Sequence, residues 1–124
     1  MKQPLLSELD LPPGIEAVLL LRRTGVVVDA VTRDSWPRDL MAVMMATLVG
    51  SVENLVEAVG HSSPESVLVR TENHLIFSTK VGARDLLAVI ARNGEVGEMK
   101  LQSTARQVLS LVNGGAVATA KSRD

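Results

Sequence analysis

The amino-acid sequence predicts an α+β domain in which two helices pack on a five-stranded antiparallel sheet. Three observations lead to this fold class. Residues 38–59 repeat apolar side chains at helical spacing, five shorter segments are rich in β-forming residues, and a second helical pattern follows Gly97. The chain has 124 residues, the usual size of one domain. The predicted order is a short N-terminal helical piece, two strands, a long helix, three strands and a final helix.

The first two predicted strands form a hairpin. Residues 15–22 are apolar on both alternation phases, which is typical of a strand buried on both faces. Residues 26–31 are rich in valine, and Thr24 and Gly25 between the two segments favour a tight turn. We therefore expect the first strand to lie in the middle of the sheet.

The long helix is predicted over residues 38–59. Ser35 and Pro37 have the positions of a helix cap and a first-turn proline, and Gly60 provides a stop. One set of apolar side chains falls within a single arc at 100° per residue, which predicts the face that packs on the sheet. This set comprises Met41, Met45, Leu48, Val52, Leu55, Val56 and Val59.

The opposite side of this helix is also poor in charged residues. Ala42, Val43, Ala46 and Gly50 fall there, and small residues four positions apart allow a second helix to approach closely. We therefore expect a second helix to pack on this side.

The second half of the chain predicts three strands and a helix. The strands are expected at residues 66–71, 75–81 and 85–91, with turns at Asn73 and Gly82. Leu101, Ala105, Val108 and Val112 then recur at helical spacing, and Asn113-Gly114-Gly115 is expected to end the helix. Residues 5–112 are thus predicted to form the domain, and residues 113–124 a flexible C-terminal tail.

Composition excludes several classes of function. The 13 basic and 14 acidic residues are interspersed, and aromatic residues make up 2% of the chain, so nucleic acid is not an expected partner. No apolar run reaches the roughly 20 residues of a membrane helix, and the N-terminal residues lack the apolar stretch of a secretory signal. We therefore expect a cytoplasmic protein without direct membrane insertion. At 46% hydrophobic residues, a chain this small is expected to bury part of its apolar surface in an oligomer.

No catalytic, cofactor or metal site is predicted. The chain has no cysteine and no phosphate-binding loop, and His61 and His74 fall in predicted surface turns as solvated residues. We therefore expect a protein that is not an enzyme and needs no cofactor. The single tryptophan, Trp36, precedes the long helix, where it is either a lid on the core or an exposed anchor for a partner.

A homodimer interface is predicted from the third strand. Val67, Leu68 and Val69 are expected on an exposed sheet edge with neither proline nor lysine to block pairing. Two such edges meeting across a two-fold axis would form one continuous sheet. The same axis would bring the long helices together near Val43, Ala46 and Gly50.

Two segments of the chain resemble the roadblock (dynein light chain) family, in its prokaryotic or archaeal form. Residues 13–28 have a proline-glycine entry, an apolar strand, a glycine turn and a second apolar strand, and residues 86–100 resemble the last strand and the entry to the final helix. The resemblance implies a profilin-like layered fold, a homodimer or heterodimer, and service as a platform or regulator for small Ras-like GTPases or motor complexes. It carries no motif of functional side chains.

The leading functional hypothesis is therefore a non-catalytic dimeric interaction module, a regulator or scaffold for a small Ras-like GTPase or a larger assembly. The alternative is a small-molecule sensor of profilin-like fold, which requires a ligand pocket between sheet and helix with convergent polar groups.

Overall fold

The computed structural model describes residue 6 and residues 10–33, 35–60, 63–94 and 97–121, with the backbone alone for residues 112–121. Seven elements follow one another along this part of the chain. They are β1 (Ile15–Arg22), β2 (Val27–Thr32), α1 (Arg38–Val59), β3 (Ser66–Arg70), β4 (His74–Val81), β5 (Asp85–Arg92) and α2 (Glu98–Lys121).

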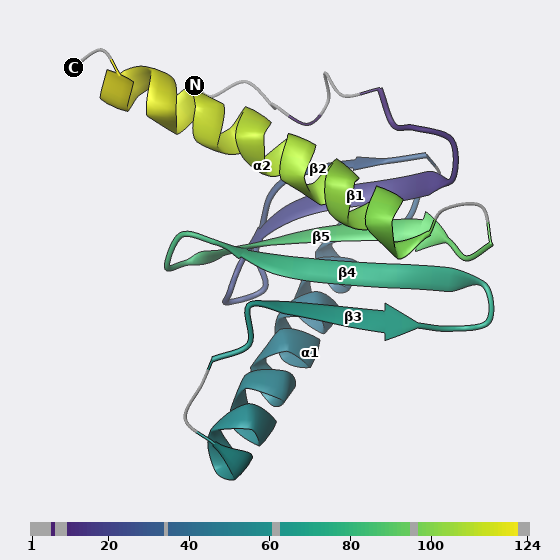
Figure 1. The fold of residues 1–124 in the computed structure, drawn as a ribbon, viewed down its shortest axis with the longest axis vertical. Coiled ribbons are helices and arrows are strands. Elements are labelled where there is room, and N and C mark those ends of the chain that lie inside the picture. The colour runs from purple at the N-terminus through teal and green to yellow at the C-terminus, as the bar shows by residue number, and fades with distance from the viewer. Residues whose placement is uncertain (1–5, 7–9, 34, 61–62, 95–96, 122–124) are drawn as a thin grey trace.

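The five strands form one antiparallel sheet in the order β2-β1-β5-β4-β3 (Figure 1). The predicted fold class is confirmed, and the short helical piece expected before the first strand falls largely outside the described residues. β1 lies inside the sheet between β2 and β5, as its continuous apolar run predicts, and seven of its eight residues are buried. The strands β2 and β3 form the two edges.

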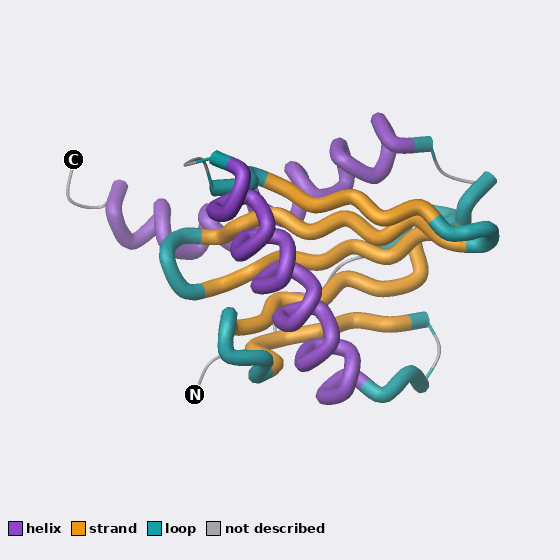
Figure 2. Tube along the Cα trace, turned by 90° about the horizontal axis from the view of Figure 1, so that it is seen from below, coloured by secondary structure: helices purple, strands orange, loops and turns teal. Residues whose placement is uncertain are grey.

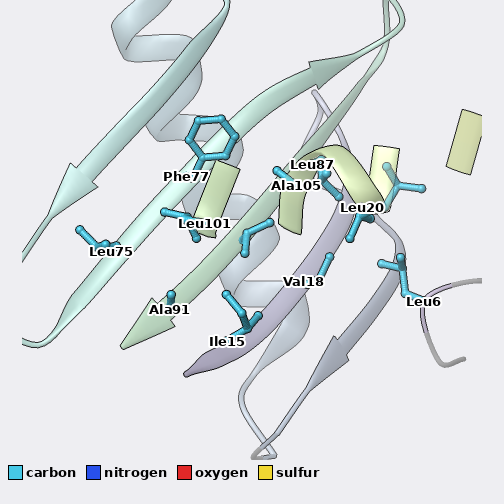
Figure 3. Packing of buried hydrophobic residues seen from close by; sticks show 12 residues of the cluster. Leu6, Ile15, Val18, Leu20, Leu75, Phe77, Leu87, Ala91, Leu101 and Ala105 are labelled. Atoms are coloured by element: carbon cyan, nitrogen blue, oxygen red, sulfur yellow. The ribbon is translucent and has the colours of Figure 1, made fainter. Parts of the chain in front are cut away.

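The two helices cover opposite faces of the sheet, so the molecule has three layers (Figures 1 and 2). Alternate residues of β1 and β5 point to opposite faces, which creates two apolar clusters. The cluster under α2, shown in Figure 3, contains Leu6, Ile15, Val18, Leu20, Leu75, Phe77, Leu87, Val89, Ala91, Leu101, Ala105 and Val108. The cluster under α1 contains Ala17, Leu19, Leu21, Ala30, Ala42, Met45, Val49, Leu86, Ala88 and Ile90.

Helix α1 has the predicted bounds but not the predicted cap. It follows Pro37, whose extended backbone occupies the N-cap position without any side-chain hydrogen bond, so the expected cap at Ser35 is wrong. A proline there fits because the first amides of a helix have no acceptor within the helix. At the other end the amide of Gly60 donates to the carbonyl of Val56 at 2.8 Å, and the predicted stop is confirmed.

The apolar face of α1 differs in part from the predicted stripe. Ala42, Met45 and Val49 are its buried residues, whereas the side chains of Leu55 and Val59 are 63% and 79% exposed. Figure 1 gives the reason: α1 crosses the sheet obliquely, and its last turns extend beyond β3. Helical spacing identifies the residues that share a side of the helix, but the length of sheet beneath them decides which are buried.

Helix α2 continues past the predicted stop. It runs through Asn113-Gly114-Gly115 to Lys121, so the expected helix end is wrong. A glycine inside a helix costs only about 1 kcal/mol relative to alanine, which an established helix tolerates. The predicted packing of Leu101, Ala105 and Val108 is confirmed, and the side chain of Val112 lies outside the described part. The flexibility expected for residues 113–124 stays a prediction.

Candidate functional site

The outer edge of β3 presents unpaired backbone groups. Within the sheet β3 pairs only with β4, which confirms that it is an edge strand. The amide of Thr71 donates to the carbonyl of His74 at 2.8 Å, so alternation along the strand turns the amides of Val69 and Val67 toward β4 as well. The amide and carbonyl of Leu68 therefore face outward, at the centre of the edge.

The other sheet edge, β2, is closed by a side chain. The amide of Arg33 donates to the carbonyl of Glu16, so alternation turns the amide of Ala30 away from the sheet. That amide donates to Oδ1 of Asp29 at 2.9 Å, and Oδ2 of the same carboxylate accepts from the amide of Leu6 at 2.8 Å. The carboxylate of Asp29 thus accepts an outward amide of the edge strand and also holds the backbone of Leu6 beside that edge.

The three predicted strand contacts lie on both faces of β3. Val67 and Val69 are half-buried on the α1 side, where Val67 packs against the apolar cluster under that helix. Leu68 lies on the α2 side opposite Phe77 and is 37% exposed. Their role in a dimer stays a prediction.

Two of the three predicted helix contacts, Val43 and Ala46, lie beside the hairpin between β1 and β2. Gly25, in the turn with φ +97°, approaches α1 so closely that an added Cβ would lie 3.3 Å from Cα of Val43 and 3.8 Å from Cβ of Ala46. Ala46 is half-buried against the core, while Val43 is 52% exposed. Gly50 meets open space within the protomer. This side of α1 is therefore partly occupied by the chain itself.

A second stripe on α1 is more exposed. Met44, Leu55 and Val59 are 62%, 63% and 79% exposed, and Leu48 is half-buried. At 100° per residue these four side chains fall within about 60° of one another. By length and composition α1 is apolar enough to cross a membrane, with a mean hydropathy of 1.4 over 18 residues of which 17% are buried. Because α1 packs on the sheet through the adjacent side, formed by Ala42, Met45 and Val49, we interpret the stripe as a surface that a further helix can cover.

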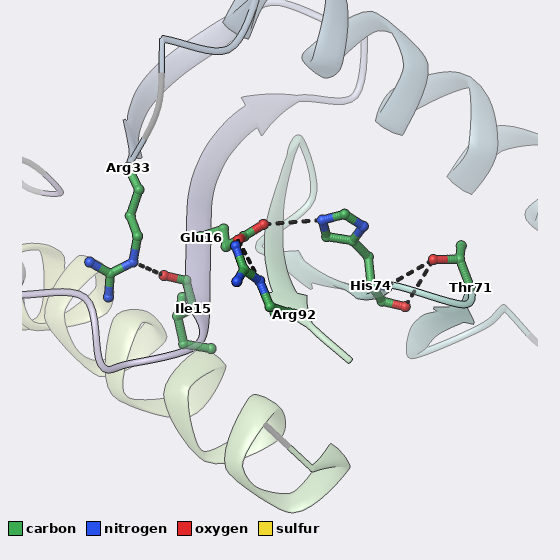
Figure 4. A network of polar contacts seen from close by, with 6 residues as sticks. All are labelled: Ile15, Glu16, Arg33, Thr71, His74 and Arg92. Carbon is green, nitrogen blue, oxygen red and sulfur yellow. Dashed lines mark hydrogen bonds and ion pairs between the residues drawn. The ribbon is translucent and has the colours of Figure 1, made fainter. Parts of the chain in front are cut away.

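A polar cluster lies at the end of the sheet where β1 begins and β5 ends (Figure 4). A bulge in β1 between Ile15 and Ala17 turns Glu16 to the α1 side, although the rest of the strand up to Leu21 is apolar. Its Oε1 lies 3.1 Å from Nε2 of His74, and its Oε2 accepts from Nε and Nη2 of Arg92 at 3.1 and 2.7 Å. One buried carboxylate therefore joins β1, β4 and β5.

Opposing effects act on the carboxyl of Glu16. Burial raises its pKa, and the hydrogen bonds from Arg92 and His74, together with their electrostatic attraction, lower it. The net result is a pKa below the ordinary value for glutamate, so Glu16 is ionised at neutral pH. Both carboxylate oxygens already have partners, which favours a structural role over proton transfer.

His74 is not the solvated turn residue that the sequence predicts. It begins β4, bonds to Glu16, and meets the indole ring of Trp36 edge-on, with ring centroids 6.4 Å apart. Trp36 is half-buried against the cluster under α1, as a lid would be; its role as a partner anchor stays a prediction. His61 lies outside the described residues. An open hollow of about 460 Å³ adjoins the pair, lined by Glu16, Trp36, Asn73, His74, Arg92 and Asn93.

Sequence reasoning missed this cluster and the exposed stripe. The signal for the cluster was Glu16, a lone charged residue inside a strand whose neighbours are all apolar. Among the described residues, no three His, Cys, Asp or Glu side chains gather closely enough to hold a metal ion. The β3 edge offers backbone groups for strand pairing, and the α1 stripe offers apolar side chains. Both are typical of surfaces that bind other proteins.

Comparison with known proteins agrees with this fold. The family model described as Roadblock/LC7 domain matches residues 1–91, which include β1 to β4 and nearly all of β5. A search of curated proteins found no match.

The solved structures include a Roadblock/LC7 domain from Streptomyces avermitilis, with TM-score 0.73, 20% identity, and coverage of 91% of this chain and 92% of that one. Myxococcus xanthus MglB has TM-score 0.73 and 15% identity over 84% of this chain and 85% of that one. The gliding protein MglB from Thermus thermophilus has TM-score 0.69 and 16% identity over 78% of this chain and 74% of that one. These likenesses concern the fold, and the family match decides membership: the chain belongs to the Roadblock/LC7 domain family.

Proposed function

We propose that this protein is a homodimeric, non-catalytic interaction module that regulates or scaffolds a small Ras-like GTPase or a larger assembly. The dimer is supported by two features that can each pair with their own copy: the open β3 edge and the exposed stripe of α1. A two-fold axis requires such a surface, because the same patch must meet its own copy.

The strand half of this surface is symmetric about Leu68. When two β3 edges pair antiparallel with Leu68 on the axis, each Val67 lies opposite the partner's Val69. The outward amide and carbonyl of Leu68 exchange two hydrogen bonds with the partner's Leu68. A ten-stranded sheet results, with no unpaired β3 edge at its centre.

The helix half is symmetric about Ser51 and Val52. In an antiparallel helix pair, Met44 meets the partner's Val59, and Leu48 meets the partner's Leu55. The four residues are spaced by four, seven and four positions, which suits two helices that pack along a shared seam. The small side chain of Ser51 at the centre allows close approach. The overhanging last turns of α1 would then lie over the sheet of the partner.

Sedimentation equilibrium at micromolar concentration tests the dimer. The wild-type chain of 13.2 kDa is expected at twice that mass. Leu55→Glu should weaken the dimer because it places a charge in the apolar seam, and the 63% exposure of Leu55 means that the protomer should still fold. Met99→Glu is the matched control. Met99 is 85% exposed and lies on α2, away from the proposed dimer surface. A wild-type protein found only at 13.2 kDa would refute the dimer.

The GTPase partner rests on family membership and on the sequence resemblance. A pull-down from the native cell extract with wild type and with Leu55→Glu tests it. A Ras-like GTPase retained by wild type and lost with the variant would support a partner site that needs the dimer. Wild-type protein that retains no GTPase in either nucleotide state would count against this partner.

The purified protein is expected to hydrolyse neither GTP nor ATP alone. Release of phosphate by the wild-type protein, lost on changing one of its own residues such as Glu16, would contradict a non-catalytic role.

The alternative of a small-molecule sensor has less support. The hollow between α1 and the sheet that is lined by Val49, Val67, Ser78 and Leu86 holds about 10 Å³, too little for a ligand. Two larger hollows, of about 460 Å³ beside His74 and about 230 Å³ between α2 and the sheet, are open at the surface.

A further inference from the structure

We propose that the surface beneath Leu6 is a peptide-binding site, which Leu6 of the same chain occupies as a releasable ligand. The class of ligand is a short peptide that offers one leucine-like side chain and one free backbone amide. Every contact that supports this site lies within one protomer, so the site does not depend on the proposed dimer.

The site combines an apolar floor with a carboxylate. In the strand register, Asp29 on β2 lies opposite Leu20 on β1. Two positions along the pair, Val31 lies opposite Val18. The three apolar residues all pack in the cluster under α2, so the carboxylate of Asp29 lies on the same face of the sheet. The pair of β1 and β2 therefore presents apolar side chains beside one negative charge.

Leu6 uses both parts of this site. Its side chain is fully buried and lies at the margin of the cluster, near Leu20 (Figure 3). Its amide donates to Oδ2 of Asp29 at 2.8 Å. One enclosed side chain and one hydrogen bond to a charged acceptor are the contacts by which a bound peptide residue is usually held.

The contacts of Leu6 are separate from those that fix the start of the sheet. Leu6 belongs to none of the seven helices and strands. Closer to β1, Nη2 of Arg33 donates to the carbonyls of Leu11 and Pro12 at 2.9 and 2.8 Å. Nε of Arg33 donates to the carbonyl of Ile15 at 2.8 Å. Because these bonds hold the entry to β1, Leu6 can leave its site without loosening the strand.

The expected strength of the contact suits release and rebinding. Burial of a leucine side chain and one hydrogen bond to a carboxylate together favour the bound form by about a thousandfold. Folding of a whole domain is usually favoured by about 10⁴ or more, so Leu6 should open more often than the sheet unfolds. For a short tether, the effective concentration is about 1 mM, so the same contacts imply a dissociation constant of about 1 μM for a separate peptide.

The full-length Leu6→Asp protein tests the site, because its own segment can no longer fill it. A fluorescent peptide of residues 1–10 should bind this variant with a dissociation constant of about 1 to 10 μM, measured by anisotropy. It should bind wild type roughly a hundredfold more weakly, because Leu6 already occupies the site. The same peptide with Leu6→Asp should bind neither protein. Circular dichroism checks that the variant is folded.

A second substitution tests the carboxylate. In the Leu6→Asp protein, Asp29→Asn should weaken binding of the peptide about tenfold, because asparagine has one acceptor oxygen and the amide of Ala30 also needs it. Asp39→Asn is the matched control and should leave binding unchanged. Asp39 is exposed in the first turn of α1, on the other face of the sheet. Equal binding by the two double variants would overturn the role of Asp29.

Hydrogen exchange of wild type tests release even if Leu6→Asp does not fold. The Leu6 amide should exchange through local opening, so low concentrations of urea should hardly change its rate. The amides of β1 need global unfolding and should exchange faster as urea is added. The same urea dependence for Leu6 and β1 would make Leu6 an integral part of the core and overturn the proposal. A folded Leu6→Asp protein that does not bind the peptide would also overturn it.

Discussion

The two edges of the sheet differ in how their backbone groups are used. At β2, Asp29 accepts the outward amide of Ala30 and the amide of Leu6, so a neighbouring strand would have to displace a carboxylate. At β3, no described side chain bonds to the outward groups of Leu68, and the adjacent side chains of Val67 and Val69 are apolar. An exposed edge of this kind pairs readily with another strand.

The comparison identifies the edge at which a second copy should add. Both edge strands lack proline and lysine, so composition alone does not separate them. What distinguishes the two edges is one side chain: the carboxylate of Asp29 closes the β2 edge, and β3 has no equivalent among the described residues. The helices reinforce it, since the last turns of α1 extend past β3 (Figure 1). A partner added at β3 would therefore gain helix contacts together with strand pairing.

The largest expected effect comes from removing the central donor of the open edge. Leu68→Pro deletes the outward amide and with it two hydrogen bonds per dimer, at about 1 kcal/mol each, so the dissociation constant should rise roughly thirtyfold or more. The protomer should still fold, because proline is tolerated on an edge strand where the lost amide faces solvent. Sedimentation equilibrium measures the dissociation constant.

Leu68→Ala is the control for this variant, since it removes the side chain and keeps the amide. Equal weakening by proline and alanine would show that the side chain, and not backbone pairing, holds the contact. An unchanged dissociation constant with proline would place the dimer elsewhere.

A smaller effect is expected from opening the closed edge. Asp29→Ala leaves the amides of Ala30 and Leu6 without their acceptor, which should lower the free energy of unfolding by about 1 to 2 kcal/mol. The variant should also form species larger than a dimer at high concentration, because both edges can then pair. Urea unfolding and light scattering measure the two effects. A variant as stable and as strictly dimeric as wild type would mean that Asp29 does not protect this edge.

The smallest effect separates the two sides of α1. Gly50→Ala should raise the free energy of unfolding by roughly 0.5 to 1 kcal/mol, because alanine favours the helix and its Cβ meets nothing within 4 Å in the protomer. The dimer dissociation constant should not change if the seam runs through Leu48 and Leu55. A weaker dimer would instead place the helix contact at Gly50, as the sequence predicts.

Much of the fold followed from local patterns. The bounds of α1, the central position of β1 and the edge position of β3 were all readable from apolar periodicity and turn residues. These features depend on neighbours in the sequence or on strand connectivity, so a single sequence contains them.

The polar cluster could not be predicted in the same way. Glu16 lies 58 residues from His74 and 76 from Arg92 in the sequence, and only the strand order brings the three together. The lone glutamate in an apolar strand indicated that a partner was needed, but not which one. Similarly, helical spacing grouped Leu55 and Val59 with the buried residues, because it contains no information on where the sheet ends.

Amide hydrogen exchange at Leu68 tests the central claim most directly. In the proposed dimer this amide is hydrogen-bonded across the axis, so its exchange should slow markedly as protein concentration rises through the dissociation constant. The amides of Val67 and Val69 face β4 and should be protected at every concentration, which provides an internal reference. A Leu68 amide that exchanges at the unprotected rate while sedimentation reports a dimer would contradict pairing of the β3 edges.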